Sequence, residues 1–259
     1  MKISIVSYSF HGLLQNEMIN IYSYLESVRY RYDLDAADIW SGMIESLDED
    51  YLKRVREALD ERELGLANLC VDGAHLWEDD PEDREEHYKL GLRWLNAAEI
   101  LGANTIRIDM GGSGEQLTDE QFEYIVKRYR EYADRAQEGG YMVGPETHWG
   151  PSLTVEVQKA VYNAVDNPAY GILLHIGHWN GGPEEQNRGD EMAAPWAMHT
   201  HVAANIAADG PEDKMRMMRE AGYDGYWGVE HHSAQNEYAE VEWQLAVVRR
   251  AAKRLQAGE

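Results

Sequence analysis

GILLHIGHWN, residues 171–180, passes directly from an apolar run into two histidines and a tryptophan. A short run of Ile and Leu that follows glycine is typical of a strand buried on both faces of a parallel sheet. His175 and His178 therefore stand at the carboxyl end of a predicted strand. Parallel α/β folds bind their ligands at that end of the strands. The segment predicts such a fold, with a functional site where several strands end.

Seven more β-rich runs occur along the chain, and helical patterns follow most of them. The predicted strands are residues 2–10, 37–40, 65–73, 104–111, 140–150, 170–178, 198–205 and 225–232. The first predicted helix begins near Asn16, and the others cover residues 48–64, 81–101, 118–138, 154–165, 211–221 and 237–256, while an irregular Gly- and Pro-rich loop follows residues 170–178. Eight such units predict a single-domain α/β fold over residues 1–259, a (β/α)8 TIM barrel of the usual size of about 250 residues. A doubly wound open sheet is the alternative.

Local signals at the helix starts support this division. Residues 118–121, TDEQ, form a capping-box sequence, in which the first and last side chains bond to each other's backbone amides. Pro81 and Pro211 follow Asp80 and Gly210 and occupy predicted first helical positions.

The composition excludes several classes of function. Acidic residues outnumber basic ones by 47 to 24, and the net charge of −23 disfavours nucleic acid as a partner. No stretch of about 18 apolar residues is present, and the N-terminal sequence lacks the features of a signal peptide, so we expect no membrane association and a cytoplasmic location. The single cysteine, Cys70, rules out an internal disulfide.

Histidines and glutamates cluster at four consecutive predicted strand ends. Seven of the ten histidines lie there together with two glutamates: Glu146, His148, His175, His178, His199, His201, Glu230, His231 and His232. Carboxylate oxygen and neutral imidazole nitrogen are common ligands of divalent metals. The cluster predicts a site for one divalent metal with positions open to substrate oxygens.

Three of these positions carry a resemblance to a known family. Glu146 in PETH, His201 in HTHV and Glu230 in GVEH resemble the metal ligands of the xylose-isomerase-like barrel superfamily, in particular of its sugar phosphate isomerase/epimerase group. The resemblance extends over nearly the whole chain, and it implies that His175 is the fourth ligand, at a position where the family usually has Asp. The alternative is that His175 lies in the wall of the site and water takes the fourth position.

This difference bears on which metal is expected. Two glutamates and two neutral histidines around a dication carry no net charge, whereas three carboxylates would leave one negative charge. Imidazole suits borderline metals, so we expect Mn²⁺, with Co²⁺, Fe²⁺ or Zn²⁺ as alternatives, rather than Mg²⁺.

Residues near the ligands are candidates for catalysis and substrate binding. His148 lies two positions after Glu146 and, with an ordinary pKa of about 6.5, is expected to act as a base. The resemblance implies that Glu146 and Glu230 also transfer protons and that His178 contacts a substrate oxygen. Trp149, Trp179 and His232 are the other expected substrate contacts. His199 is expected to point away from the barrel interior and to be structural or to contact a metal ligand from behind.

These residues predict an enzyme that removes a proton next to the carbonyl of a sugar or sugar derivative, giving isomerisation or epimerisation. A lyase that uses the same enolate chemistry on 3-oxo-glycosides, as C-glycoside deglycosidases do, or on inososes is the alternative. A non-catalytic carbohydrate-binding subunit and an apurinic endonuclease are the other possibilities. The group also implies an oligomer, and the deglycosidase branch implies a small partner subunit.

Overall fold

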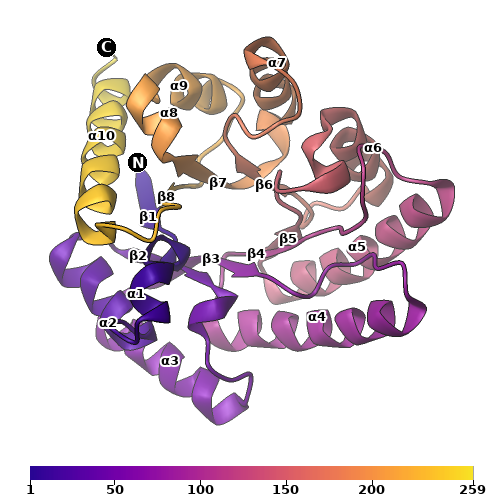
Figure 1. Ribbon diagram of the computed structural model, residues 1–259, viewed down its shortest axis with the longest axis horizontal. Helices are drawn as coiled ribbons and strands as arrows, with labels where there is room; N and C mark the ends of the chain where they lie inside the picture. Colours follow the sequence, from indigo (N-terminus) through magenta and orange to yellow (C-terminus); the bar gives the residue numbers. More distant parts are fainter. Residues whose placement is uncertain (259) are drawn as a thin grey trace.

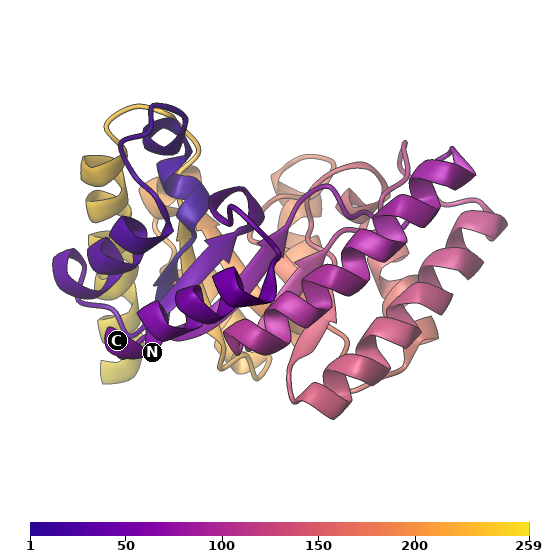
Figure 2. The same cartoon turned by 90° about the horizontal axis from the view of Figure 1, so that it is seen from below.

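The computed structural model describes residues 1–258, in which eight strands lie inside a ring of helices (Figure 1). The strands are β1 (Lys2–Ile5), β2 (Ala36–Trp40), β3 (Gly65–Val71), β4 (Thr105–Ile108), β5 (Met142–Gly144), β6 (Ile172–His175), β7 (Ala197–Ala203) and β8 (Tyr226–Glu230). The α-helices are α1 (His11–Gln15), α2 (Ile21–Glu26), α3 (Glu49–Glu61), α4 (Pro81–Leu101), α5 (Asp119–Gly139), α6 (Val155–Val165), α7 (Pro183–Ala193), α8 (Ala204–Asp209), α9 (Glu212–Glu220) and α10 (Glu237–Ala257). Figure 2 shows the two ends of the chain on the same side of the molecule.

The strands follow one another around the ring in chain order. They form two parallel sheets, in the orders β1-β8-β7-β6 and β2-β3-β4-β5. Isolated parallel bridges join the sheets, between Val6 and Asp38 at one seam and between Val143 and Tyr170 at the other. At the second seam a Cβ on Gly144 would lie 1.7 Å from the carbonyl oxygen of Gly171, so only glycine permits this approach. This is the strand order of the predicted α/β barrel.

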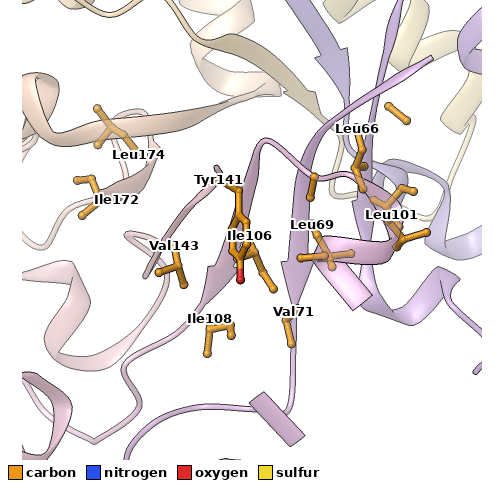
Figure 3. Close-up of a cluster of buried hydrophobic side chains, with 14 of the residues drawn as sticks. Leu66, Leu69, Val71, Leu101, Ile106, Ile108, Tyr141, Val143, Ile172 and Leu174 are labelled. Carbon is orange, nitrogen blue, oxygen red and sulfur yellow. The ribbon is translucent and has the colours of Figure 1, made fainter. Parts of the chain in front are cut away.

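The outer face of the strands forms the core against the helices. Figure 3 shows Leu69 and Val71 of β3 beside Ile106 and Ile108 of β4, with Leu101 of α4 packed among the same group. All five side chains are almost completely buried. Burying one such side chain contributes about 1.5–3 kcal/mol, so this layer stabilises the barrel and holds its strand ends in place.

The predicted helix starts are mostly confirmed. The Thr118 hydroxyl accepts a hydrogen bond from the Gln121 amide at 3.2 Å, and the Gln121 side chain accepts one from the Thr118 amide at 2.8 Å. Asp80 caps α4, with Pro81 as the first helical residue. Pro211, in contrast, precedes α9 as its N-cap residue, because the helix begins at Glu212.

Several predicted boundaries differ from the structure; the first strand, for example, ends at Ile5 instead of residue 10, and a short 3-10 helix follows it. The helix expected from Asn16 is replaced by two short helices, α1 and α2, on either side of this residue. The fifth strand ends at Gly144, before Glu146. The loop expected after residues 170–178 contains α7, because Pro183 at its first position and the Glu185 carboxylate, which accepts a hydrogen bond from the Gly182 amide, form a regular helix start.

Within residues 1–258, no helix combines the length and the apolar character needed to cross a membrane.

Candidate active site

All four predicted metal ligands meet at the carboxyl ends of the strands. Glu146 follows β5, His175 ends β6, His201 lies in β7 and Glu230 ends β8. Each offers one ligand atom, and these four atoms all lie within 4.8 Å of one another. Nδ1 of His201 lies 3.3 Å from a carboxylate oxygen of both Glu146 and Glu230, and Nδ1 of His175 lies 3.1 Å from Glu146. All four side chains are buried.

The strand register and the backbone around Glu146 explain this convergence. His175 and His201 are register partners on adjacent strands. Gly228 lies opposite His201, and a Cβ there would come within 2.9 Å of the imidazole, so the glycine leaves room for the ring. Glu146 lies beyond β5, but its amide donates to Asp109 at 3.2 Å, and an isolated bridge ties it to Leu173.

The four side chains fit a divalent metal. Nδ1 of His201 and Oε2 of Glu230 are buried, and neither has a hydrogen-bond partner among the residues that the structure describes. The other ring nitrogen of His201 lies 3.4 Å from the Asp38 carboxylate, which leaves Nδ1 directed at the cluster. A carboxylate behind a ligating histidine is a common feature of metal sites. Two carboxylates and two imidazoles suit Mn²⁺, Co²⁺, Fe²⁺ and Zn²⁺.

The two glutamates carry negative charge despite their burial. Burial alone would raise the pKa of Glu146, but Arg107, His175 and His201 lower it well below its ordinary range. Burial would likewise raise the pKa of Glu230, and His201 contributes most to holding it well below that range. Both side chains can therefore act as anionic ligands and as proton acceptors.

The predicted orientation of His199 was wrong. Its Nε2 lies 2.6 Å from Oδ2 of Asp38, the same oxygen that His201 approaches. Side chains two positions apart on a strand point to the same face, so His199 and His201 both face the barrel interior. His199 lies beneath the ligand cluster and holds Asp38 in place.

A cavity of about 290 Å³ opens beside the ligand cluster. It is lined by Val6, Tyr8, Trp40, Cys70, Asp72, Arg107, Glu146, His148, His175, His178, Glu230 and His232. The wall thus combines metal-type ligands, two large aromatic side chains and several polar groups. A small polar molecule with a flat or ring-shaped part matches this lining.

His148 lies at this cavity, but its imidazole differs from the expected one. Its Nδ1 is 2.9 Å from Oδ2 of Asp109. Burial alone would lower the pKa of His148, but the Asp109 carboxylate raises it to about 9. The ring is therefore mainly protonated at pH 7, in contrast to the ordinary pKa predicted from sequence.

The remaining predicted contacts divide into two groups. His178 and His232 line the cavity, and His232 lies 3.3 Å from the Glu230 carboxylate. Trp149 and Trp179 are not part of the lining. Trp149 packs edge-on against His75, with the ring centres 5.0 Å apart, and the buried Trp179 donates to Asp190 at 2.9 Å.

Arg107, the buried cation of the site, was not among the residues predicted from the sequence. Its Nη1 donates to Asp72 and to Asp109, both at 2.8 Å, and its Nε lies 3.2 Å from Glu146. The signal was present in the TIRID sequence of residues 105–109, where alternation places a charged residue on the inner face of a buried strand. A charged residue in that position requires partners, and here three carboxylates supply them.

Comparison with known proteins identifies relatives of this fold. The family model described as "Xylose isomerase-like TIM barrel" matches residues 30–251. The structure of the 3-keto-D-glucoside 4-epimerase YcjR from E. coli is similar, with a TM-score of 0.77 and 17% identity over 96% of this chain and 99% of that one. The probable 3-DHS dehydratase AsbF from Bacillus anthracis gives a TM-score of 0.74 and 17% identity over 96% and 99%.

A third similar structure contains a metal ion. A xylose isomerase-like TIM barrel protein from Mycobacterium smegmatis, solved in complex with magnesium, gives a TM-score of 0.68 and 15% identity over 88% of this chain and 89% of that one. Among curated proteins, none matches the sequence. At these identities the structural likenesses show the shared fold.

Proposed function

Because the chain belongs to the xylose isomerase-like TIM barrel family, we propose that it is a divalent-metal-dependent enzyme acting on a sugar or sugar derivative. The proposed reaction removes a proton next to a carbonyl and returns it to the other face or to the neighbouring carbon, which gives epimerisation or isomerisation. The observation that carries this proposal is the convergence of Glu146, His175, His201 and Glu230 beside a cavity of about 290 Å³.

The four residues of this cluster are the proposed metal ligands. A divalent metal at this position would polarise the substrate carbonyl and offset the negative charge that develops as the proton leaves. Mn²⁺ is the proposed ion, with Co²⁺, Fe²⁺ or Zn²⁺ as alternatives, because His175 adds an imidazole where the family usually has a carboxylate. One relative binds magnesium, so Mg²⁺ belongs among the ions to be compared.

Glu146, Glu230 and His148 are the proposed proton-transfer residues. All three line the cavity; Glu146 follows β5 and Glu230 ends β8, with β6 and β7 between these strands. One carboxylate of this pair takes the proton from carbon; in isomerisation it returns the proton to the neighbouring carbon, and in epimerisation the other carboxyl group supplies a proton to the opposite face. Asp109 orients His148 through Nδ1, which leaves the other ring nitrogen to exchange a proton with a substrate oxygen.

The cavity wall supplies the proposed substrate contacts. His178 and His232 can hydrogen-bond to hydroxyl groups, and Tyr8 and Trp40 can pack on a sugar ring or a flat aglycone. Trp149 and Trp179 are left out of the proposal because neither lines the cavity. Tyr8 and Trp40 pack against each other at 5.1 Å between ring centres, so they form one aromatic wall.

β-Elimination is the second candidate. The paired His148 and Asp109 favour it, because an imidazolium facing the substrate can protonate a leaving group after the α-proton has been removed. The structural likeness to a dehydratase is compatible with this outcome. Formation of oligomers or association with a small partner subunit stays a prediction, for which light scattering of the purified protein is the direct test.

The first experiment measures bound metal per chain in the wild type and in His175→Ala and His201→Ala. We expect each variant to lose one equivalent of metal, while His11→Ala, which removes a histidine outside the cluster, keeps the wild-type amount. Ketoses and 3-oxo-glycosides are then incubated in D₂O and followed by NMR. Solvent deuterium at the α-carbon supports the proposal, and retention of all metal in both ligand variants would contradict it.

A further inference from the structure

A second group of metal-type ligands lies outside the cavity. His75 and Glu78 belong to the segment between β3 and α4, and His87 lies in α4. Each offers one donor atom, and the three atoms lie within 4.8 Å of one another. Nδ1 of His75 is 2.7 Å from Oε1 of Glu78, and Nδ1 of His87 is 3.4 Å from the same oxygen. Two imidazoles and a carboxylate thus converge on one point.

The backbone holds this group in place. The amides of Leu76 and Trp77 donate to the carbonyl oxygens of Asp109 and Met110 at 3.0 and 2.9 Å, so the segment between His75 and Glu78 is tied to the chain after β4. A Cβ on Gly111, whose φ is +75°, would lie 2.2 Å from the Trp77 oxygen, so the two segments are in close contact. His75 and Glu78 therefore start from fixed backbone positions, which lowers the entropic cost of binding an ion.

One ligand atom of this group has no hydrogen-bond partner. Nδ1 of His87 is buried, and within residues 1–258 it has no hydrogen-bond partner. Unsatisfied polar atoms of this kind are uncommon, and an unseen ion is one of their standard explanations. The side chains of His75 and His87 are each 25% exposed, so one side of the group remains open to solvent.

The surrounding charge favours a cation. Residues 78–86 contain seven acidic side chains and one arginine, Arg84. This arginine is directed elsewhere, because its Nε donates to the Glu78 carbonyl oxygen at 2.8 Å and its guanidinium lies 3.5 Å from the centre of the Trp77 ring. A negative potential at the group raises the local concentration of divalent ions.

We propose that His75, Glu78 and His87 bind a second divalent metal ion of the borderline class, such as Zn²⁺ or Co²⁺. Two imidazole nitrogens and a carboxylate oxygen are an established Zn²⁺ ligand set, with a further position for water. The ion joins the β3–α4 segment to α4. Through the contact between His75 and Trp149, it also steadies the chain next to His148. None of the three ligands of this site takes part in the proposed reaction.

The test separates the two sites by titrating Zn²⁺ into variants against a chromophoric chelator. In Glu230→Gln, which disables the cavity cluster, we expect one equivalent of Zn²⁺ to remain bound. In the double variants Glu230→Gln/His87→Ala and Glu230→Gln/Glu78→Gln, we expect that equivalent to be lost. Glu230→Gln/Glu86→Gln is the matched control, because it removes a neighbouring exposed charge without removing a ligand, and it should still bind one equivalent.

The pattern of Zn²⁺ loss among the variants shows which of the two proposed sites is absent. If Glu230→Gln binds no Zn²⁺ while the wild type binds one equivalent, the second site is absent and the cavity site stands. If the wild type binds one equivalent that persists in Glu230→Gln and disappears in His87→Ala, the second site stands and the proposed metal-dependent function fails. Circular dichroism of every variant, compared with the wild type, shows that a loss of metal does not come from unfolding.

Discussion

Neighbouring residues of β4 face two different environments. Ile106 and Ile108 lie in the apolar layer against the helices, whereas Arg107 between them faces the cavity and its carboxylates. The outer layer gains stability from buried apolar area, which depends on shape more than on exact identity. The inner face depends on matched charges, because a buried ion is stable only with its partners. The two faces should therefore respond differently to mutation.

Arg107→Met is the substitution expected to have the largest effect on folding. It leaves Asp72, Asp109 and Glu146 near one another without the cation that pairs with all three. Breaking a buried ion pair by removing one partner costs about 3–5 kcal/mol. Urea unfolding of metal-free protein at pH 7 measures this loss. A change below about 1 kcal/mol would show that the inner charges do not depend on Arg107.

Ile106→Ala tests the outer face of the same strand. The side chain is completely buried in the layer drawn in Figure 3, so its truncation leaves a cavity and should cost about 2–5 kcal/mol in the free energy of unfolding. Metal affinity of the folded variant should stay within about threefold of the wild type, well under the 10–100-fold cost of losing a partner of a ligand. A larger fall in affinity would mean that the two faces are coupled.

Asp38→Asn should change metal binding more than folding. The substitution keeps the shape of the side chain but weakens its interaction with His201 and His199. Loss of such a partner behind a ligand typically lowers metal affinity by about 10–100-fold. Competition titration with a chelator measures the change. Asn68→Ala, which alters another partner of Asp38 without touching His201, is the comparison variant, and it should give the smaller fall.

Glu99→Gln has the smallest expected effect, because Glu99 lies on neither face of the strands. It belongs to α4 and pairs with Arg135 of α5. Glu99 accepts hydrogen bonds from Arg135 at 2.7 and 2.8 Å, and Arg135 lowers its pKa. A lowered carboxyl pKa stabilises the fold above the ordinary value of 4.5, and this contribution is lost as pH falls. Because the pair is about one-third exposed, we expect Glu99→Gln to cost at most about 1 kcal/mol at pH 7, and we expect this cost to shrink as the pH falls below 4.5. Free energies of unfolding of the wild type and the variant, measured from pH 7 downward, test this. A cost that grows as the pH falls would contradict the prediction.

Apolar periodicity predicted the number and order of the strands, because each is a buried run with a helix after it. The meeting of Glu146, His175, His201 and Glu230 was predictable for a related reason, since the carboxyl ends of parallel strands share one edge of the barrel. Arg107 was not predicted because the strand was recognised from its apolar residues alone. The alternation of its two faces, which places Arg107 inside the barrel, was not considered. The raised pKa of His148 depends on Asp109, which is 39 positions away, and no local pattern reports such a contact.

Gly228 shows how a residue without a functional group can limit the evolution of this site. A side chain at this position would meet both the Thr200 carbonyl oxygen, 2.7 Å from the Cβ, and the His201 imidazole. Any larger residue at position 228 would displace the His201 imidazole and so disturb the ligand cluster, whatever the substrate. Directed evolution toward new substrates would therefore find position 228 closed, whereas Tyr8 and Trp40 belong to the cavity wall itself.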